Sequence, residues 1–335
     1  MIARDPSLIG TSLAYSPALD GLRAICILFT FCHHIKGMPG FINGTIGVDI
    51  FFVLSGFLIT ALVLGPSKPT LKSYYIRRCF RILPVYYLAY FLMVGGTLLI
   101  HVLGIGGPSM TQLEQIWLPS LLISRELVPE MIALFAYAWT VGIEEKFYLI
   151  WPLVVLTLAT TRNLALFLGA LVLSLFLLGY ADQIRGYGGI AVGCLAGILL
   201  FRHGLYLALP AALVLLVAVY TALFWIDIPY ENIFLAPAAA GLVASLYVHG
   251  NSALARWLAH PVLVTLGRWT FALYMFHLMV LFWVGFVLEQ LDLRVWWIEF
   301  LIGYPLSVLV AAVIYRSYEK PLIDVGRRLA ARTAG

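Results

Sequence analysis

Two adjacent histidines, His33 and His34, end an apolar stretch that carries Asp20 and Arg23 near its beginning. An ionisable group inside a membrane helix costs at least ~2.5 kcal/mol on insertion scales, so each one is a candidate for function. Eleven residues separate Arg23 from His34, which amounts to about three helical turns plus roughly 20°. Arg23 and His34 therefore share a face with Asp20, whereas His33 points about 100° away. We predict that His34 is catalytic, as a general base or nucleophile.

The remaining groups of this stretch allow other interpretations. His34 can instead be a packing histidine, and His33 is expected to face a neighbouring helix or lipid headgroups. Arg23 lies about 16 Å from His34 along the helix axis. In an unbroken helix the two side chains therefore cannot contact the same small group of a substrate. Asp20 and Arg23, at positions i and i+3, can form an ion pair at the helix start.

Carboxylates in two further segments are candidates to meet His34. Asp49 lies near the start of GVDIFFVLSGFLIT, after a short turn, and is expected at a depth close to that of His34. A carboxylate beside a histidine fixes its tautomer and raises its basicity. The alternative for Asp49 is a helix N-cap. Glu144 and Glu145 lie near the start of WTVGIEEKFYLIWP, which is expected to enter the membrane from the non-cytoplasmic side. One of them can orient His34 or act as a second base. The alternative is that they only complement the helix dipole.

Arginines gather in SYYIRRCFRILP, where Arg77 and Arg81 are spaced i, i+4 and Arg78 and Arg81 are spaced i, i+3. Either pair is expected to present two guanidinium groups on one face at the cytoplasmic boundary, which suits a phosphate or pyrophosphate. The alternative is a basic flank that touches anionic lipid.

The C-terminal third adds three further candidates. His277 lies in the middle of RWTFALYMFHLM, with Tyr274 three residues before it, and Glu319 stands in YEKP at the cytoplasmic boundary. Glu319 is in a position to form an ion pair with the arginines of the third span.

These residues must be placed by membrane helices. The chain has 335 residues, of which 62% are hydrophobic and 11% charged, and its mean hydropathy is +0.98. Soluble proteins carry about 25% charged residues. We predict an all-α, polytopic integral membrane protein, a single membrane-embedded domain over 1–335 with its core at 18–322. Ten apolar segments are candidate spans of about 20 residues: 20–36, 45–65, 74–102, 143–160, 163–180, 187–202, 205–225, 232–249, 266–289 and 295–318.

The distribution of charge orients these spans. With both termini in the cytoplasm, 15 of the 21 lysines and arginines fall on the cytoplasmic side and most acids on the other. This is the positive-inside pattern of membrane proteins. The net charge of +5 therefore does not indicate a nucleic-acid-binding surface. The one long connection, 103–142, is expected on the non-cytoplasmic side, as a loop or as re-entrant or interfacial helices. The four cysteines show no metal-ligand spacing, so no metal is expected. We interpret the first apolar segment as a retained span rather than a cleaved signal.

Six blocks, in order, resemble acyltransferase family three, the integral membrane acyltransferases. They are LDGLRAICILFTFCHH, GVDIFFVLSGFLIT, YYIRRCFRILPVYY, WTVGIEEKFYLIWP, LGRWTFALYMFHLMV and YEKPL, and together they cover about 18–322. The resemblance implies ten membrane helices and transfer of an acyl group, often acetyl, from cytoplasmic acyl-CoA to a hydroxyl at the other face of the membrane. It implies catalysis by His34, with Arg23 as its paired arginine. It also implies that Arg78 and Arg81 engage the CoA phosphates.

The resemblance gives less definite roles to Glu144, Glu145 and His277. It makes acetyl-CoA the expected co-substrate and a carbohydrate or glycolipid the expected acceptor, at the bacterial inner membrane. A secondary transporter would also have ten spans with internal charges, but it should show an internal repeat, and none is evident. A polysaccharide-export accessory protein would explain the basic cytoplasmic face but not His34.

Overall fold

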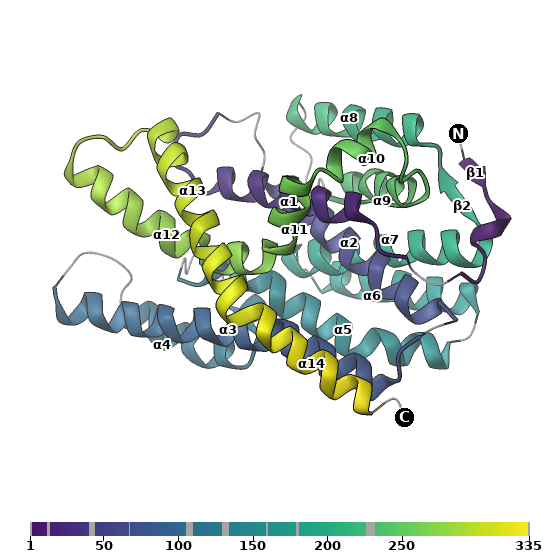
Figure 1. Ribbon diagram of the computed structural model, residues 1–335, viewed down its shortest axis with the longest axis horizontal. Coiled ribbons are helices and arrows are strands. Elements are labelled where there is room, and N and C mark those ends of the chain that lie inside the picture. The colour runs from purple at the N-terminus through teal and green to yellow at the C-terminus, as the bar shows by residue number, and fades with distance from the viewer. Residues whose placement is uncertain are drawn as a thin grey trace. The chain divides into compact units, whose positions relative to one another are not determined.

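The computed structural model describes residues 2–11, 14–39, 44–66, 68–104, 110–128, 134–158, 160–178, 181–225 and 232–333. The described chain is almost entirely helical (Figure 1). Its α-helices are α1 (Pro17–His33), α2 (Thr45–Leu64), α3 (Leu71–Val102), α4 (Met110–Leu121), α5 (Trp139–Thr157), α6 (Thr161–Leu177), α7 (Ala181–His203), α8 (Leu209–Trp225), α9 (Asn232–Val248), α10 (Ala253–Leu258), α11 (Pro261–Arg268), α12 (Thr270–Gln290), α13 (Trp296–Ile314) and α14 (Lys320–Arg332).

A helix covers most of each of the ten predicted spans, and the all-α prediction is confirmed. Among the described residues, five helices are long and apolar enough to cross a membrane: Ile46–Leu64, Leu71–Val102, Gln183–His203, Thr270–Gln290 and Trp296–Arg332. Three shorter apolar helices accompany them: Thr161–Leu177, Leu209–Trp225 and Phe234–Val248. The two remaining predicted spans, α1 and α5, carry Asp20, Arg23, Glu144 and Glu145 among their residues. These helices indicate a multi-pass membrane protein, while the number and direction of its crossings stay predictions.

One small sheet departs from the all-helical pattern. Strand β1 (Ile2–Arg4) pairs antiparallel with β2 (Leu205–Leu207), with Ala3 opposite Tyr206. The chain turns into β2 at Gly204, whose φ of 66° favours glycine. A pairing across some 200 residues leaves no local signal, so sequence patterning does not predict it.

The chain divides into two compact units, each described by itself. Unit 1 comprises Met1–Pro69 and Phe147–Thr270, and unit 2 comprises Thr70–Lys146 and Phe271–Gly335. In unit 1, α2 packs closely on α7, and α1 packs on α2 and α11. Its buried core includes Leu54, Phe57, Phe201 and Val243.

Helices α2 and α7 approach so closely because glycines face the partner's backbone. A Cβ on Gly193 would collide with the carbonyl of Val53, and one on Gly56 would collide with the carbonyl of Ile190. Small residues allow this close approach in membrane helices, where van der Waals packing drives association. The successive contacts of Gly189, Gly193 and Gly197 lie at Phe52, Val53 and Phe57–Thr60, so the two helices run parallel.

In unit 2, α14 runs beside α3 (Figure 1). The two helices meet where Gly326 lies against the ring of Phe80. A π-helical turn, η4 (Tyr315–Glu319), joins α13 to α14. Pro321 follows this turn, and its missing N–H removes one helical hydrogen bond. π-turns inside helices are frequent at functional sites.

Candidate active site

The two histidines stand at the end of α1, in unit 1. His33 is the last helical residue and His34 is the C-cap, with φ −88° and ψ 0°. Both side chains are exposed, and their rings meet edge-on with centroids 5.3 Å apart. The first residue beyond the short turn, Gly44, lies against the Cβ of His33. The start of α2 therefore packs directly beside this histidine pair.

Asp49 is held by an arginine that the sequence analysis assigned no role. Its carboxylate Oδ1 accepts a hydrogen bond from Nε of Arg185 at 2.7 Å, and its Oδ2 accepts one from Nη2 at 3.2 Å. The carboxylate side chain is only 2% exposed, against 24% for the arginine. The N-cap interpretation of Asp49 is wrong, because the N-cap of α2 is Gly44 and Asp49 is the fifth residue of the helix.

The positive charge of Arg185 also acts on the ring of His33. One end of unit 1 thus gathers a histidine pair, a buried carboxylate and an arginine, contributed by α1, α2 and α7. Such a cluster can accept a proton and can stabilise a developing negative charge.

The other end of α1 carries the predicted acidic and basic pair. Nη1 of Arg23 donates to Oδ1 of Asp20 at 2.8 Å, so the ion pair predicted from the i, i+3 spacing is present. The hydroxyl of Tyr15 donates to the other carboxylate oxygen of Asp20 at 2.8 Å. Arg268 in turn donates to the Tyr15 oxygen at 3.0 Å. Arg23 therefore belongs to a polar chain that continues to Arg268, which the spacing argument did not reach.

In unit 2, Arg78 contacts both glutamates of the α5 start. Its Nε and Nη2 donate to Oε1 of Glu145 at 2.9 and 2.7 Å, and Glu144 lies 3.8 Å from Nη2. Arg77 and Arg81 are exposed on the same helix, whereas Arg78 is half-buried. The guanidinium face is therefore divided, with Arg78 directed at carboxylates within the protein.

This contact corrects the predicted depths. Arg78 was expected at the cytoplasmic boundary and Glu145 at the opposite face, yet their side chains bond. Along α3, Arg78 lies about 36 Å from Val102, whereas Glu145 lies only about 9 Å from the first residue of α5. Helix α5 therefore begins well short of the end of α3 at Val102, measured along the axis of α3.

That connection is built around α4, which packs on α3. Three tyrosine hydroxyls of α3 donate to carbonyls of the last turns of α4: Tyr86 to Ser120 at 2.7 Å, Tyr87 to Leu121 at 3.1 Å and Tyr90 to Trp117 at 2.9 Å. The last four carbonyls of a helix lack helical partners. The hydroxyls of Tyr86 and Tyr87 satisfy two of these and fix the end of α4 against the middle of α3. A helix inside 103–142, one of the open alternatives, is confirmed.

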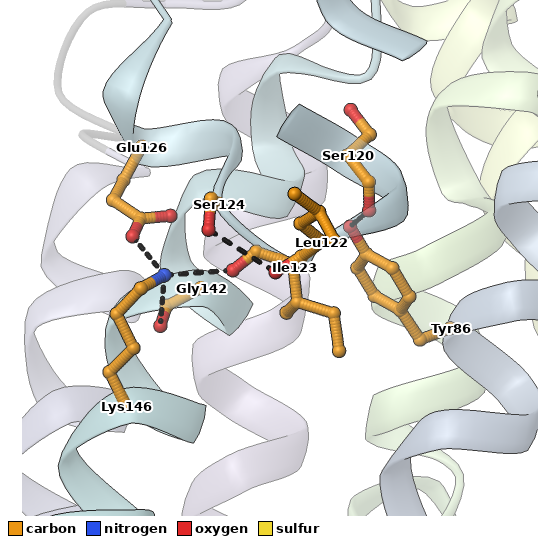
Figure 2. A network of polar contacts seen from close by, with 8 residues as sticks. All are labelled: Tyr86, Ser120, Leu122, Ile123, Ser124, Glu126, Gly142 and Lys146. Carbon is orange, nitrogen blue, oxygen red and sulfur yellow. Dashed lines mark hydrogen bonds and ion pairs between the residues drawn. The ribbon is translucent and has the colours of Figure 1, made fainter. Parts of the chain in front are cut away.

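Lys146 secures the loop after α4 (Figure 2). Its Nζ bonds to Glu126 and donates to the carbonyl of Ile123 at 2.9 Å. Ile123 has a φ of 53°, a left-handed conformation that is rare for a β-branched residue. Arg125 and Glu126, in the 3₁₀ turn η2 (Arg125–Leu127), are both buried. The three consecutive charged residues of α5 therefore all make contacts inside unit 2.

His277 and Tyr274 lie in a buried network of unit 2. His277 is fully buried, and its Nδ1 donates to the carbonyl of Tyr274 at 2.7 Å. The hydroxyl of Tyr274 donates to the carbonyl of Tyr137 at 2.7 Å, and Tyr137 donates to the carbonyl of Met275 at 2.7 Å. These bonds tie α12 to the turn before α5. They favour a structural role for both candidates.

Glu319 is buried in the π-turn η4, against α3. The positive charge of Arg81 acts on its carboxylate. This interaction agrees with the prediction that Glu319 pairs with the arginines of the third span. Its Oε2 makes no hydrogen bond within the described part of the chain. His34 and the glutamates of α5 belong to different units, so their pairing stays a prediction.

The described chain is almost entirely helical, and five of its described helices are long and apolar enough to cross a membrane. The family model of the acyltransferase domain matches residues 16–316. The chain therefore belongs to acyltransferase family three.

Two curated relatives are proteins of Staphylococcus aureus. "Putative O-acetyltransferase SAS0844" of strain MSSA476 is 27% identical over 358 aligned residues, covering 94% of this chain and 58% of the relative. "O-acetyltransferase OatA" of strain NCTC 8325 / PS 47 is 26% identical, covering 93% of this chain and 58% of the relative. This chain thus spans somewhat over half the length of these relatives. No solved structure matches it.

Proposed function

We propose that this protein is a membrane O-acetyltransferase that takes an acetyl group from acetyl-CoA on the cytoplasmic side. The acceptor is a hydroxyl of a carbohydrate or lipid-linked glycan at the other face of the bacterial inner membrane. Membership of acyltransferase family three and the names of the staphylococcal relatives support this proposal. The observation that carries the chemistry is the histidine pair at the end of α1, near the ion pair of the buried Asp49 with the partly exposed Arg185.

His34 acts as the general base in this proposal. Its neutral imidazole takes the proton of the acceptor hydroxyl, whose oxygen attacks the thioester carbon. The C–S bond then breaks, and the departing CoA thiolate takes the proton from the imidazolium. In the alternative route the imidazole itself carries the acetyl group briefly.

The donor enters from the side of the arginines. Arg77 and Arg81, exposed on α3, hold phosphates of CoA, and Arg23 lies further along the path. Arg78 belongs to this set only if a phosphate replaces Glu145 as its partner. The pantetheine arm then carries the thioester towards His34.

Consumption of labelled acetyl-CoA by the purified protein in detergent tests the proposal. Wild-type protein should release CoA in the presence of a polysaccharide or glycolipid fraction, and the His34→Ala protein should not. Equal release by both proteins would refute the role of His34. Absence of any acetyl-CoA consumption, together with uptake of a solute into proteoliposomes, would favour a transporter.

A further inference from the structure

Asp49 and Arg185 form a two-point ion pair near the histidines. Two donors of one guanidinium meet two oxygens of one carboxylate, at 2.7 and 3.2 Å. Such a two-point contact fixes the plane of the guanidinium as well as its position. The carboxylate is 2% exposed, whereas about a quarter of the arginine side chain remains accessible. Asp49 is thus a buried support, and Arg185 is the reachable member of the pair.

The packing of α7 on α2 fixes the height of this arginine. Arg185, Gly189, Gly193 and Gly197 recur every four residues, so they lie along one stripe of α7. The three glycines meet α2 at Phe52, Val53 and Phe57–Thr60. Since backbone contact leaves no room for sliding, Arg185 is held one turn beyond Gly189, at the start of α2.

That position places a permanent positive charge at the histidine pair. Arginine keeps its charge whatever else it binds. The charge of Arg185 acts on His33, whose ring touches that of His34 at a centroid distance of 5.3 Å. Among the described residues, Asp49 on α2 and His33 on α1 interact electrostatically with Arg185, and His34 lies beside His33.

We propose that Arg185 is a further catalytic residue of acyl transfer and that Asp49 is the residue that positions it. This inference rests on the proposed function. When the acceptor oxygen bonds to the thioester carbon, the carbonyl electron pair moves onto oxygen and forms an oxyanion. Arg185 contacts that oxyanion and stabilises it. The pair returns as the C–S bond breaks, and the thiolate takes the proton that His34 removed from the acceptor.

Four variants separate this role from a merely structural ion pair: Arg185→Gln, Asp49→Asn, the double variant and the charge swap Asp49→Arg/Arg185→Asp. Loss of one oxyanion donor typically lowers kcat by about 10²–10³-fold. We expect that loss in Arg185→Gln, with the KM for acetyl-CoA nearly unchanged. Asp49→Asn should lower kcat in the same direction, and the double variant should be no slower than Arg185→Gln alone. Effects that multiply would show that Asp49 acts on a histidine separately, and would overturn its positioning role.

The charge swap is the decisive control. It restores an ion pair but moves the cation from α7 to α2. We expect it to recover the yield and melting temperature of the folded protein but not its kcat. Recovery of kcat to near the wild-type value would overturn the proposal, because the pair would then serve only to hold the helices.

If the Arg185→Gln protein does not fold, a variant that keeps the positive charge at position 185 provides the test instead. Arg185→Lys retains the cation but loses the two-point contact. It should keep a measurable fraction of kcat, well above that of the charge swap, and equal rates in these two folded proteins would refute the inference. Wild-type protein that consumes no acetyl-CoA would instead refute the proposed function itself. Active wild-type protein with a fully active Arg185→Gln variant would refute this inference alone.

Discussion

At the scale of single residues, the adjacent histidines lead to opposite predictions. His34 shares the helical face of Arg23 and lies just beyond the last turn of α1. His34→Ala should lose about 10²–10⁴-fold in kcat, the usual contribution of a positioned general base. His33→Ala is the matched control, since it removes an equal ring one residue earlier. The measurement is acetyl-CoA consumption by both proteins at equal folded concentration. A greater loss in His33→Ala would mean that the helical-face argument selected the wrong ring.

Arg78 and Arg81 differ in their partners, and their variants should differ in kinetics. Arg81→Gln should raise the KM for acetyl-CoA with kcat nearly unchanged, because it removes a contact made equally in the ground and transition states. Arg78→Gln should instead lower kcat, because it releases Glu145. The double variant Arg78→Gln/Glu145→Gln should be no slower than the single one, since the two side chains act as a pair. An increase in KM alone for Arg78→Gln would return Arg78 to the phosphate site.

The sequence predicts a contact between two residues only when they lie close together along the chain. Asp20 and Arg23 lie on one helix, so spacing alone predicts their ion pair. Glu145 lies 67 residues from Arg78, and Arg185 lies 136 residues from Asp49. No periodicity relates such positions in a single sequence. The available signal for Arg185 is its place at the head of a stripe of glycines spaced by four, which marks it as part of a helix interface.

At the scale of elements, the tyrosine caps of α4 predict a stability effect without a chemical one. Tyr86→Phe keeps the ring but removes one of the two donors of the buried carbonyl of Ser120, which keeps the N–H of Ile123 at 3.1 Å. The net loss of one hydrogen bond costs about 0.5–1.5 kcal/mol, so the melting temperature in detergent should fall. Tyr87→Phe is the control, because its bond is longer and its side chain is only half-buried. A drop for Tyr87→Phe as large as for Tyr86→Phe would contradict the idea that burial sets this cost.

The glycine stripe of α7 predicts a contrast between neighbouring glycines. Gly193→Ala places a Cβ against the carbonyl of Val53, whereas a Cβ on Gly188 meets nothing within 4 Å. Alanine is favoured over glycine in a helix by about 0.8–1.0 kcal/mol. Gly188→Ala should therefore be neutral or stabilising, and Gly193→Ala should lower both the melting temperature and the acyl-transfer rate. Equal melting temperatures for the two variants would show that the α2–α7 contact is not as close as described.

The existence of the helices is predictable because apolar length is a strong local signal. Ten apolar segments predict ten helices, and each lies where it is expected within a few residues. The less predictable parts are the contacts of α4, which carries Glu114 and Pro119 among its apolar residues, and the ribbon of β1 and β2. The sequence leaves helices within 103–142 open as one alternative, but α4 is fixed by tyrosines of α3, and β1 pairs with a strand about 200 residues away. Local patterning carries no information about these distant partners.

At the scale of the whole molecule, the parallel contact of α2 and α7 constrains how the chain crosses the membrane. Parallel spanning helices enter from the same side, so an odd number of crossings must separate the end of α2 from the start of α7. The predicted spans of α3, α5 and α6 supply three. A fourth crossing by α4 would make α7 antiparallel to α2, contrary to the glycine contacts. We therefore predict that the connection 103–142 enters and leaves on one side of the membrane.

Cysteine labelling tests this topology. Cys79 is exposed whereas Cys26, Cys32 and Cys194 are buried, so a Cys79→Ser background leaves only buried thiols. In that background, Gly104→Cys and Leu127→Cys flank α4 at exposed positions. A membrane-impermeant maleimide should reach both from outside intact cells. Arg332→Cys should be labelled only after permeabilisation, because the basic C-terminus is predicted to be cytoplasmic. Labelling of Leu127→Cys exclusively from the cytoplasm would show that α4 spans the membrane. The order of crossings would then have to be redrawn, and His34 and the arginines of α3 would no longer be expected at opposite ends of the acyl-CoA path.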